Sequence, residues 1–399
     1  MSAPGTSQSP RLAAVLREGE RVTALELFFD LVFVLALTQC TALMAATLSW
    51  EGLLKALLVL GVLWWAWTGY AWLTSVVDPE EGAVRIVMFA AMAALLVAAL
   101  CVPGAFGGDA VLFVCAYGVV RAAHIGLFLL ASREDRELRS SVLGLAGGTA
   151  IGLGLLLGAA FAATGVQIAL WALALLLDMG GPFLFGSEGW RLVPEHFAER
   201  HGAIIIIALG ESIVAIGAGA SRGVGAGVVA AAVLGVVVAA AMWWLYFDVV
   251  AIVATRRLAQ AKEGRERNEI ARDSYSYLHL PMIAGIALVA LGLKRTLAEV
   301  GTPLGLVAAT AMLGGGAMYL LAHIAFRWRN VHSFNPHRAI CAAALVALLA
   351  LEAELRLPAL ATLAIFAAVL STLIAYEAIR FAGARDRVRH ELARGGAAS

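Results

Sequence analysis

The sequence predicts an all-α integral membrane protein that crosses a bilayer about twelve times. Hydrophobic residues make up 61% of its 399 residues and charged residues only 14%, and the mean hydropathy is +0.87. Soluble domains average about 45–50% apolar and about 25% charged residues, so this chain has too little charge to cover a surface in water. Lipid is therefore expected to be its main solvent, with the backbone polar groups satisfied inside helices.

Twelve apolar runs are long enough to be considered as spans of the hydrocarbon core, which needs about 20 helical residues. These runs are 26–48, 53–76, 83–102, 110–131, 140–163, 166–186, 201–219, 225–252, 276–294, 303–326, 337–351 and 358–381. The eleventh run is the shortest and leads into Glu352, Glu354 and Arg356. The runs are too long and too continuous for the alternating strands of about ten residues that form a transmembrane barrel.

Lys and Arg between the runs predict the orientation of the chain. The side that holds the N-terminus carries 23 of them and the opposite side five, while Arg121 lies inside a run. Because cytoplasmic loops carry the excess of Lys and Arg, both termini are expected in the cytoplasm. No cleaved signal peptide is expected, since residues 1–20 contain no apolar core.

The chain also shows an ordered set of internal similarities. Trp64-Trp65 recurs as Trp243-Trp244, Met88-Phe-Ala-Ala-Met-Ala resembles Met282-Ile-Ala-Gly-Ile-Ala, and Ala123-His124-Ile125 recurs as Ala322-His323-Ile324. The offsets grow along the chain, as a long loop at 253–275 requires. Each half would contain six helices. Because six is an even number, the two halves would insert in the same direction, as tandem, parallel repeats. The expected parts are a cytoplasmic tail 1–25, a first half 26–186, a cytoplasmic linker 187–200, a second half 201–382 and a basic cytoplasmic tail 383–399.

Cofactors, metals and nucleic acids are not expected. The four cysteines lie in or beside apolar runs without CxxC spacing, which is typical of small buried side chains. A net charge of +1 without a separate basic domain argues against a nucleic-acid partner. No HExxH, Walker or GxSxG motif is present. The expected partners are the lipid bilayer and an unidentified ion or small solute, and a homo-oligomer is left open.

Charged residues inside apolar runs are the main indication of function, because each costs about 2.5–3.5 kcal/mol at a helix centre on insertion scales. In the first run, Glu26, Asp30, Thr38 and Thr41 share one helical stripe about 120° wide. Such a stripe is expected to face partner helices or a cavity. The alternative places Glu26 and Asp30 at the membrane interface, where the helix N-terminus favours acids.

Glu211 lies about ten residues inside the seventh run, which is roughly 15 Å along a helix. Ser212 follows it, and Arg200 and His201 precede the run's apolar part. A carboxylate at this depth is interpreted as functional by default. The alternative is that Glu211 is a structural partner for Arg121.

Arg121 lies at the centre of the fourth run and shares a face with Tyr117 and His124. A carboxylate should meet it, because an unpaired Arg in hydrocarbon is costly. The candidates are Asp30, Asp178 and Glu211. The sequence does not choose among them, and a structural ion pair resembles a proton-coupled switch at this level.

The remaining polar positions have a structural interpretation, and some of them also have a functional one. Asp178 precedes Gly-Gly-Pro182, which predicts a simple helix end or, alternatively, a cation site beside freed carbonyls. Asp248 follows a cluster of Trp and Tyr that is typical of an interfacial belt. His279 and His323 are either polar core contacts or members of a proton relay.

Several separated motifs resemble the bacterial low temperature requirement A (LtrA) family. They are Glu26-Leu-Phe-Phe-Asp30-Leu-Val-Phe-Val, His196-x-x-Glu199-Arg200-x-Gly202, Leu209-Gly210-Glu211-Ser212, Trp244-Leu-Tyr-Phe-Asp248, and His279-Leu-Pro with Gly285. The resemblance runs from about Glu20 to Arg380. It implies a multi-pass protein of the bacterial inner membrane that is associated by name with growth in the cold, and it implies no molecular activity.

A fainter likeness links Phe28-Phe29-Asp30 to endosomal and bacterial potassium channels with a Phe-Ser-Asp motif in the first helix. The Arg that precedes that motif in the channels is replaced here by Ala24, and the second half offers His201-Gly202-Ala203. Both departures argue against a potassium channel.

The leading hypothesis is a transporter or channel for an ion or small solute. Its polar path is expected between the two halves, lined by Glu26, Asp30, Arg121, His124, Asp178, Arg200, His201, Glu211, Ser212, Asp248, His279 and His323. One alternative is a structural or regulatory stress-response membrane protein that contains buried ion pairs only. The other is a lipid-modifying enzyme in which Glu199, Arg200 and His201 supply acid, base and phosphate clamp.

Overall fold

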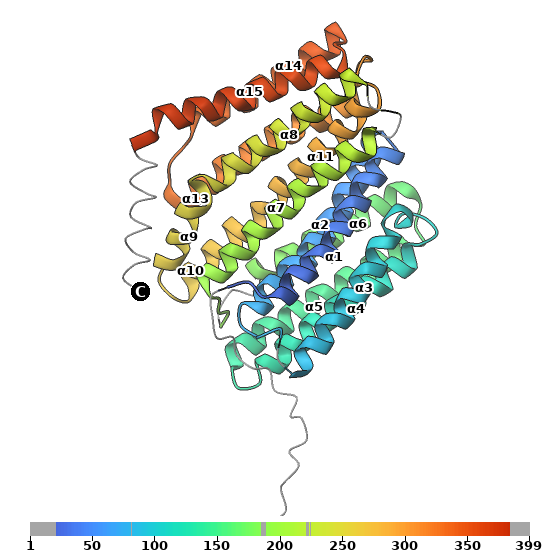
Figure 1. Ribbon diagram of the computed structural model, residues 1–399. Coiled ribbons are helices and arrows are strands. Elements are labelled where there is room, and N and C mark those ends of the chain that lie inside the picture. The colour runs from blue at the N-terminus through green and yellow to red at the C-terminus, as the bar shows by residue number, and fades with distance from the viewer. Residues whose placement is uncertain (1–20, 81, 185–188, 221–222, 224, 384–399) are drawn as a thin grey trace, which may run out of the picture. The chain divides into compact units, whose positions relative to one another are not determined.

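A computed structural model describes residues 21–80, 82–184, 189–220, 223 and 225–383, and its regular elements are helices (Figure 1). Within these residues, eleven helices are long and apolar enough to cross a membrane. The chain is therefore a multi-pass all-α membrane protein, as the sequence predicts. The elements are α1 (Ala24–Ala46), α2 (Trp50–Thr74), α3 (Gly82–Cys101), the 3-10 helix η1 (Val102–Gly104), α4 (Ala110–Ala131), α5 (Arg136–Ala159), α6 (Thr164–Leu184), α7 (Pro194–Gly219), α8 (Ala226–Phe247), α9 (Val250–Gln260), α10 (Arg265–Ile270), the π-helix η3 (Ala271–Tyr277), α11 (His279–Ala298), α12 (Leu306–Ala309), the π-helix η4 (Thr310–Gly314), α13 (Gly315–Val331), α14 (Pro336–Leu355) and α15 (Ala359–Arg380).

The helices form two compact units. Among the described residues, the first comprises 21–36 and 62–197, and the second comprises 37–61 and 198–383, so that α1, α2 and α7 contribute to both. In the first unit, α3 packs against α4, α4 against α5, and α5 against α6 (Figure 1). In the second unit, α8 packs against α15, and α11 packs against α13. The duplication and the boundaries of its halves stay predictions.

Two charged segments are helical where the sequence predicts none. α7 begins at Pro194, well before the predicted start at residue 201, and proline suits the first position of a helix. His196 and Arg200 are fully buried, so their polarity does not end the helix. The expected loop at 253–275 is instead occupied by α9, α10 and η3. α9 is amphipathic, because it buries Ala254 and Leu258 while the opposite side carries basic residues.

α6 ends two residues after Pro182, close to the helix end predicted at Gly-Gly-Pro182. α6 continues through these residues to Leu184. Pro182 lies in the last turn, where its missing N–H deprives only the carbonyl of Asp178, four residues earlier, of a donor. The loss of one hydrogen bond so close to the terminus does not interrupt the helix.

α14 occupies the eleventh predicted run but is not among the eleven helices that meet the length and hydropathy requirements. It begins where the Asn335 side chain accepts hydrogen bonds from the backbone N–H groups of His337 and Arg338 at 3.1 and 3.2 Å. Its two buried charges, Arg338 and Glu352, contact α15 through Glu377 and Thr362. The polar residues that weaken this run as a span are therefore satisfied by the neighbouring helix.

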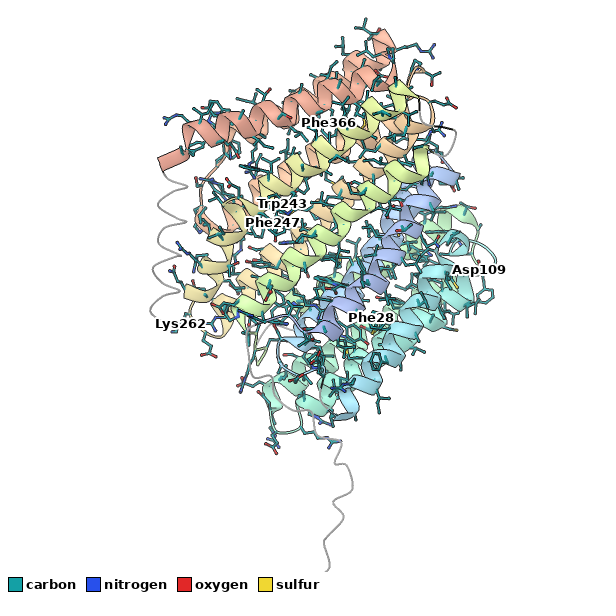
Figure 2. The ribbon with its side chains drawn as sticks, viewed as in Figure 1. Phe28, Asp109, Trp243, Phe247, Lys262 and Phe366 are labelled. Carbon is teal, nitrogen blue, oxygen red and sulfur yellow. The ribbon has the colours of Figure 1, made fainter. Side chains whose placement is uncertain are left out.

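Large apolar side chains also lie on the outer surfaces of both units. Phe28 of α1 is 51% exposed and Trp243 of α8 is 44% exposed, and Trp243 stacks on Phe247 (Figure 2). Exposed apolar surface of this extent marks contact with a partner or a membrane in soluble proteins. On helices of this length and hydropathy, the outer faces fit the acyl chains of lipid.

Small residues bring α11 and α13 into close contact. A Cβ added at Gly315 would lie 2.8 Å from the carbonyl oxygen of Gly285, so neither backbone leaves room for a side chain. A Cβ added at the next residue, Gly316, would lie 2.7 Å from the ring of Phe366, which belongs to α15. Glycine therefore sets the distance between these helices, as in other membrane bundles.

Gly315→Ala should lower the stability of the protein, because the added methyl group overpacks the contact and costs about 1–3 kcal/mol. Gly314→Ala is the matched control, since its Cβ would meet only the Thr310 methyl group at 3.6 Å. Thermal unfolding in detergent should show a lower midpoint for Gly315→Ala and an unchanged or higher one for Gly314→Ala. Equal midpoints for the two variants would contradict the close contact.

Candidate functional site

Glu26 lies in the first turn of α1 and helps to cap the helix. Its carboxylate accepts a hydrogen bond from the backbone N–H of Thr23 at 2.8 Å, while its own N–H donates to the Thr23 hydroxyl at 3.3 Å, which is a capping box. The same carboxylate lies 2.9 Å from Nε2 of His196, and both side chains are fully buried. Nδ1 of His196 lies 3.2 Å from the Ser75 hydroxyl. Glu26 thus joins the start of α1 to α7, and through His196 to Ser75, the residue after α2, within the first unit.

Asp30 lies one turn further along α1 and is also fully buried. Its Oδ1 accepts a hydrogen bond from the indole N–H of Trp67 at 2.7 Å. Trp67 stacks on Trp64 with ring centroids 4.9 Å apart. Both acids of the predicted stripe therefore face protein, while Glu26 also lies in the first turn of α1, where the alternative expects the helix N-terminus to favour an acid.

Asp178 is the partner of Arg121, which decides among the three candidates. Nη2 of Arg121 donates to Asp178 Oδ1 at 3.0 Å and to the Thr149 hydroxyl at 2.6 Å, and Thr149 donates to the same carboxylate at 3.0 Å. The Tyr117 hydroxyl reaches the other carboxylate oxygen at 3.4 Å. The ion pair is buried, and a cavity of about 10 Å³ beside it has room for about one water. Since Asp178 already has a cationic partner, the cation-site interpretation loses its ligand.

His124 packs against Gly69 of α2, which has no side chain. A Cβ added at Gly69 would lie 2.7 Å from Cε1 of the imidazole, so the ring occupies the space that this glycine leaves open. The ring of Tyr70 lies 5.4 Å away. His124 is buried and is held by packing.

Glu211 is a buried carboxyl group, 3% exposed, whose hydrogen-bond partners are hydroxyl groups. Oε2 lies 2.5 Å from the Thr38 hydroxyl and Oε1 lies 2.5 Å from the Thr41 hydroxyl. In the part of the chain that the structure describes, no Lys, Arg or His forms an ion pair with Glu211. These contacts lie within the second unit.

The Thr41 hydroxyl has a single hydrogen to donate, and this limits how it can bond to Glu211 in the ionised and in the protonated state. The Thr41 hydroxyl is also 2.8 Å from the Thr38 carbonyl oxygen, and it has one hydrogen to donate. If Glu211 is ionised, the two acceptors compete for that hydrogen. If Glu211 is protonated, its O–H donates to Thr41, and Thr41 donates to the carbonyl. The geometry therefore accommodates a carboxyl group with its proton bound or released.

Arg200, His201 and Ser212 are fully buried on α7, whereas Glu199 is exposed. The ring of His201 lies 5.1 Å from that of His279 and 5.2 Å from that of Tyr275. Glu199, Arg200 and His201 therefore do not share one accessible surface. This arrangement gives the lipid-modifying hypothesis no open cluster in these residues.

His279 follows the π-helix η3, and its two ring nitrogens have different partners. Nδ1 lies 3.0 Å from the Ser274 carbonyl oxygen, which can only accept, so the neutral ring carries its hydrogen on Nδ1. Nε2 then accepts a hydrogen bond from the Tyr246 hydroxyl at 2.8 Å. π-helical turns often occur at functional sites because they redirect backbone groups, and here the turn supplies the carbonyl that fixes the tautomer.

His323 has the opposite tautomer. Arg338 can only donate, and its Nη1 lies 3.1 Å from Nδ1 of His323, so the neutral ring carries its hydrogen on Nε2. That Nε2 is buried without a hydrogen-bond partner in the described residues. The His323 ring lies 5.8 Å from the ring of Tyr246. Arg338 also forms a two-point ion pair with Glu377, at 3.0 and 2.9 Å.

Asp248 ends α8 as its C-cap residue and is half-buried. The aromatic cluster before it does not share one face, since Trp243 and Trp244 are exposed but Tyr246 is 1% exposed, and the interfacial belt stays a prediction. Sequence reasoning missed the roles of Trp67, Thr149 and Arg338, which lie far along the chain from their partners. No group of three or more His, Cys, Asp or Glu in the described ranges could hold a metal ion.

Comparisons with known proteins agree with the motifs in the sequence. Residues 21–375 match the family described as "Bacterial low temperature requirement A protein (LtrA)". An uncharacterized protein of Rhizobium meliloti (strain 1021) is 30% identical over 314 residues, which cover 74% of this chain and 74% of that protein. No solved structure matches the chain. The family match includes the buried clusters described above apart from Glu377.

Proposed function

The chain belongs to the bacterial low temperature requirement A (LtrA) family, and from this premise we propose that it is a carrier that moves protons, alone or together with a small solute, across the membrane. The observation that carries the proposal is the buried Glu211 carboxyl group with hydroxyl partners. A carboxyl group at membrane depth marks an ion or proton pathway by default.

Glu211 is suited to bind and release a proton. An ionised carboxylate without a cation is costly in a low-dielectric interior, so protonation lowers the cost of burial. The two threonine hydroxyls stabilise either form, because each can donate or accept a hydrogen bond. An acid already paired with arginine, such as Asp178, lacks this freedom.

The second part of the proposed path is the series of side chains His279, Tyr246 and His323. Proton uptake by His279 at Nε2 would make this nitrogen a donor to the Tyr246 oxygen, and the phenol hydrogen would then turn away. The neighbouring His323 carries its hydrogen on Nε2, which has no partner in the described residues, and its ring lies 5.8 Å from that of Tyr246. In the neutral state this N–H can donate toward the Tyr246 oxygen while the Tyr246 hydroxyl donates to Nε2 of His279, so the hydrogens are ordered for transfer from His323 toward His279.

The distance between these two elements favours a carrier over an open channel. His201, whose ring lies 5.1 Å from that of His279, is ten residues from Glu211 on α7, about 15 Å along the helix. Ile204, Ile205 and Ala208 lie between them and are buried. Because apolar side chains give a proton nothing to bind, transfer between the two sites requires a conformational step.

Tyr246→Phe tests the relay. The variant removes the hydroxyl group that donates a hydrogen bond to Nε2 of His279. Losing one buried hydrogen bond costs about 1–3 kcal/mol. Proton entry into proteoliposomes should therefore slow by about tenfold or more. Tyr319→Phe is the matched control, since its hydroxyl donates to the backbone carbonyl of Met242 at 2.7 Å, where no proton can continue. Proton entry driven by a pH gradient is measured with a dye inside the vesicles.

The expected order of rates is wild type, then Tyr319→Phe close to it, then Tyr246→Phe, with protein-free vesicles lowest. Equal rates for the two phenylalanine variants would contradict the relay. Wild-type vesicles that leak protons no faster than protein-free ones, with every solute tried, would end the proposal.

A structural or regulatory role is the second candidate. The Arg121–Asp178 and Arg338–Glu377 ion pairs favour it, since each acid has a cation and needs no proton. Under this alternative, variants of the two pairs would change stability, and no variant would change flux because there would be none.

The same proposal places the protein in the bacterial inner membrane with both termini in the cytoplasm. The 23 Lys and Arg on the side of the N-terminus, against five on the other, support it. A role in low-temperature growth is suggested by the family name alone. Cysteine labelling of intact cells at residues 263 and 301 would test the orientation.

A further inference from the structure

A pocket of about 410 Å³ lies in the second unit where several helices end. Its walls come from the last turns of α8, α13 and α15, the start of α14, and α9. The volume falls within the range of about 300–1,000 Å³ that small-molecule sites occupy. The proton path proposed above does not use this space.

The walls of the pocket are polar on one side and mostly apolar on the other. The α8–α9 side is lined by Leu245, Val249, Val250, Val253 and Ala254, together with Trp244 and one carboxylate, Asp248. The side formed by α13 and the start of α14 carries Arg327, Asn330, Ser333, Asn335 and Arg338. A ligand that fits both sides has a polar head and an apolar tail.

Arg327 provides the positive charge of the polar side. It is exposed, its guanidinium donates to the Ser333 hydroxyl at 3.2 Å, and no carboxylate in the described segments forms an ion pair with it. Arg338 is different, because Glu377 already neutralises it at 2.9 Å. Arg327 is thus available to an anionic group such as a phosphate.

Asn330 provides a buried acceptor in the same wall. It is 3% exposed, and its Nδ2 donates to the Ser274 hydroxyl and the Phe326 carbonyl. Its Oδ1 has no hydrogen-bond partner in the described residues. A buried acceptor in this state is costly, so a ligand that donates an N–H or O–H group would satisfy it.

The rim of the pocket fits the boundary of a bilayer. Trp244 is 37% exposed and Phe381 is 41% exposed, and both line the pocket. Aromatic side chains gather at membrane–water interfaces. Arg327, Arg329 and Arg380 lie at helix ends that the Lys and Arg excess predicts to be cytoplasmic, where basic pockets between helices bind lipid head groups.

We propose that this pocket binds one anionic phospholipid whose head group also carries a hydroxyl donor, of the phosphatidylglycerol type. The phosphate contacts Arg327, the hydroxyl donates to Oδ1 of Asn330, and the first part of an acyl chain lies against α8 and α9. The inference stands without the proposed proton transport, since it concerns a different set of residues.

The test is a titration of the detergent-solubilised full chain with dioleoyl phosphatidylglycerol, followed by native mass spectrometry. We expect one tightly held molecule in the wild type and about tenfold weaker binding in Arg327→Gln, the loss equivalent to one charge-assisted hydrogen bond. Arg329→Gln is the matched control, because Arg329 lies on the same helix, pairs with Asp273 at 2.9 Å and does not line the pocket. It should bind within about twofold of the wild type.

Two other lipids test which features of the phosphatidylglycerol head group the pocket recognises. Dioleoyl phosphatidylcholine lacks both the net charge and the hydroxyl donor, and oleate lacks the donor, so both should bind more weakly than phosphatidylglycerol. Unchanged thermal midpoints without added lipid confirm that the variants are folded. Equal losses in Arg327→Gln and Arg329→Gln, or equal binding of the choline lipid or of oleate, would overturn the proposal.

Discussion

Replacing Glu211 with glutamine should reduce proton transport to the leak of protein-free vesicles while the protein stays folded. Glutamine has the shape of the protonated acid and can keep hydrogen bonds with the Thr38 and Thr41 hydroxyls. It cannot release a proton at any ordinary pH. The substitution therefore removes the chemistry of the site and leaves its packing.

The measurement is proton flux in proteoliposomes together with the thermal midpoint in detergent. Glu263→Gln is the control, since Glu263 is an exposed residue before α10 and should give wild-type flux. Wild-type flux in Glu211→Gln would show that the carboxyl group is structural.

Arg121→Met should be the most destabilising single change in the first unit. It leaves the buried Asp178 carboxylate without its cation, and breaking a buried pair by removing one partner costs about 3–5 kcal/mol. The double variant Arg121→Met/Asp178→Leu should recover most of the loss, because apolar residues of similar volume can replace a buried pair at little cost. Thermal or denaturant unfolding in detergent measures the three proteins.

An exposed pair in the same unit provides the comparison. Arg191 lies 3.4 Å from Asp135, and its side chain is 72% exposed. Arg191→Met should cost about 0–1 kcal/mol, since exposed pairs are worth little. A loss in Arg121→Met no larger than in Arg191→Met would mean that water reaches the Arg121–Asp178 pair.

The helices follow from hydropathy, whereas their ends depend on contacts that the sequence does not reveal. The run 110–131 coincides with α4, because its flanks are a short turn and charged residues. α7 was expected to begin at residue 201, but it already includes His196 and Arg200. These residues are buried in protein, and a charge that has a partner inside the fold does not end a helix as a solvated one does.

The candidate site was predictable as a set of residues and not as a set of contacts. The stripe Glu26, Asp30, Thr38 and Thr41 indicates the inward face of α1, and all four have buried partners. The sequence could not show that the threonines meet Glu211, some 170 residues away. Nor could it choose Asp178 for Arg121, because side-chain reach across helices depends on their packing. Tyr246 lies next to exposed tryptophans in the sequence, and only the direction of its side chain separates it from them.

The central claim is that Glu211 binds and releases a proton inside the protein, and infrared difference spectroscopy tests it most directly. The account predicts a carbonyl band of a protonated carboxyl group that disappears reversibly as the pH is raised, in the wild type and not in Glu211→Gln. A wild-type spectrum identical to that of Glu211→Gln across the whole pH range in which both proteins are folded would contradict it.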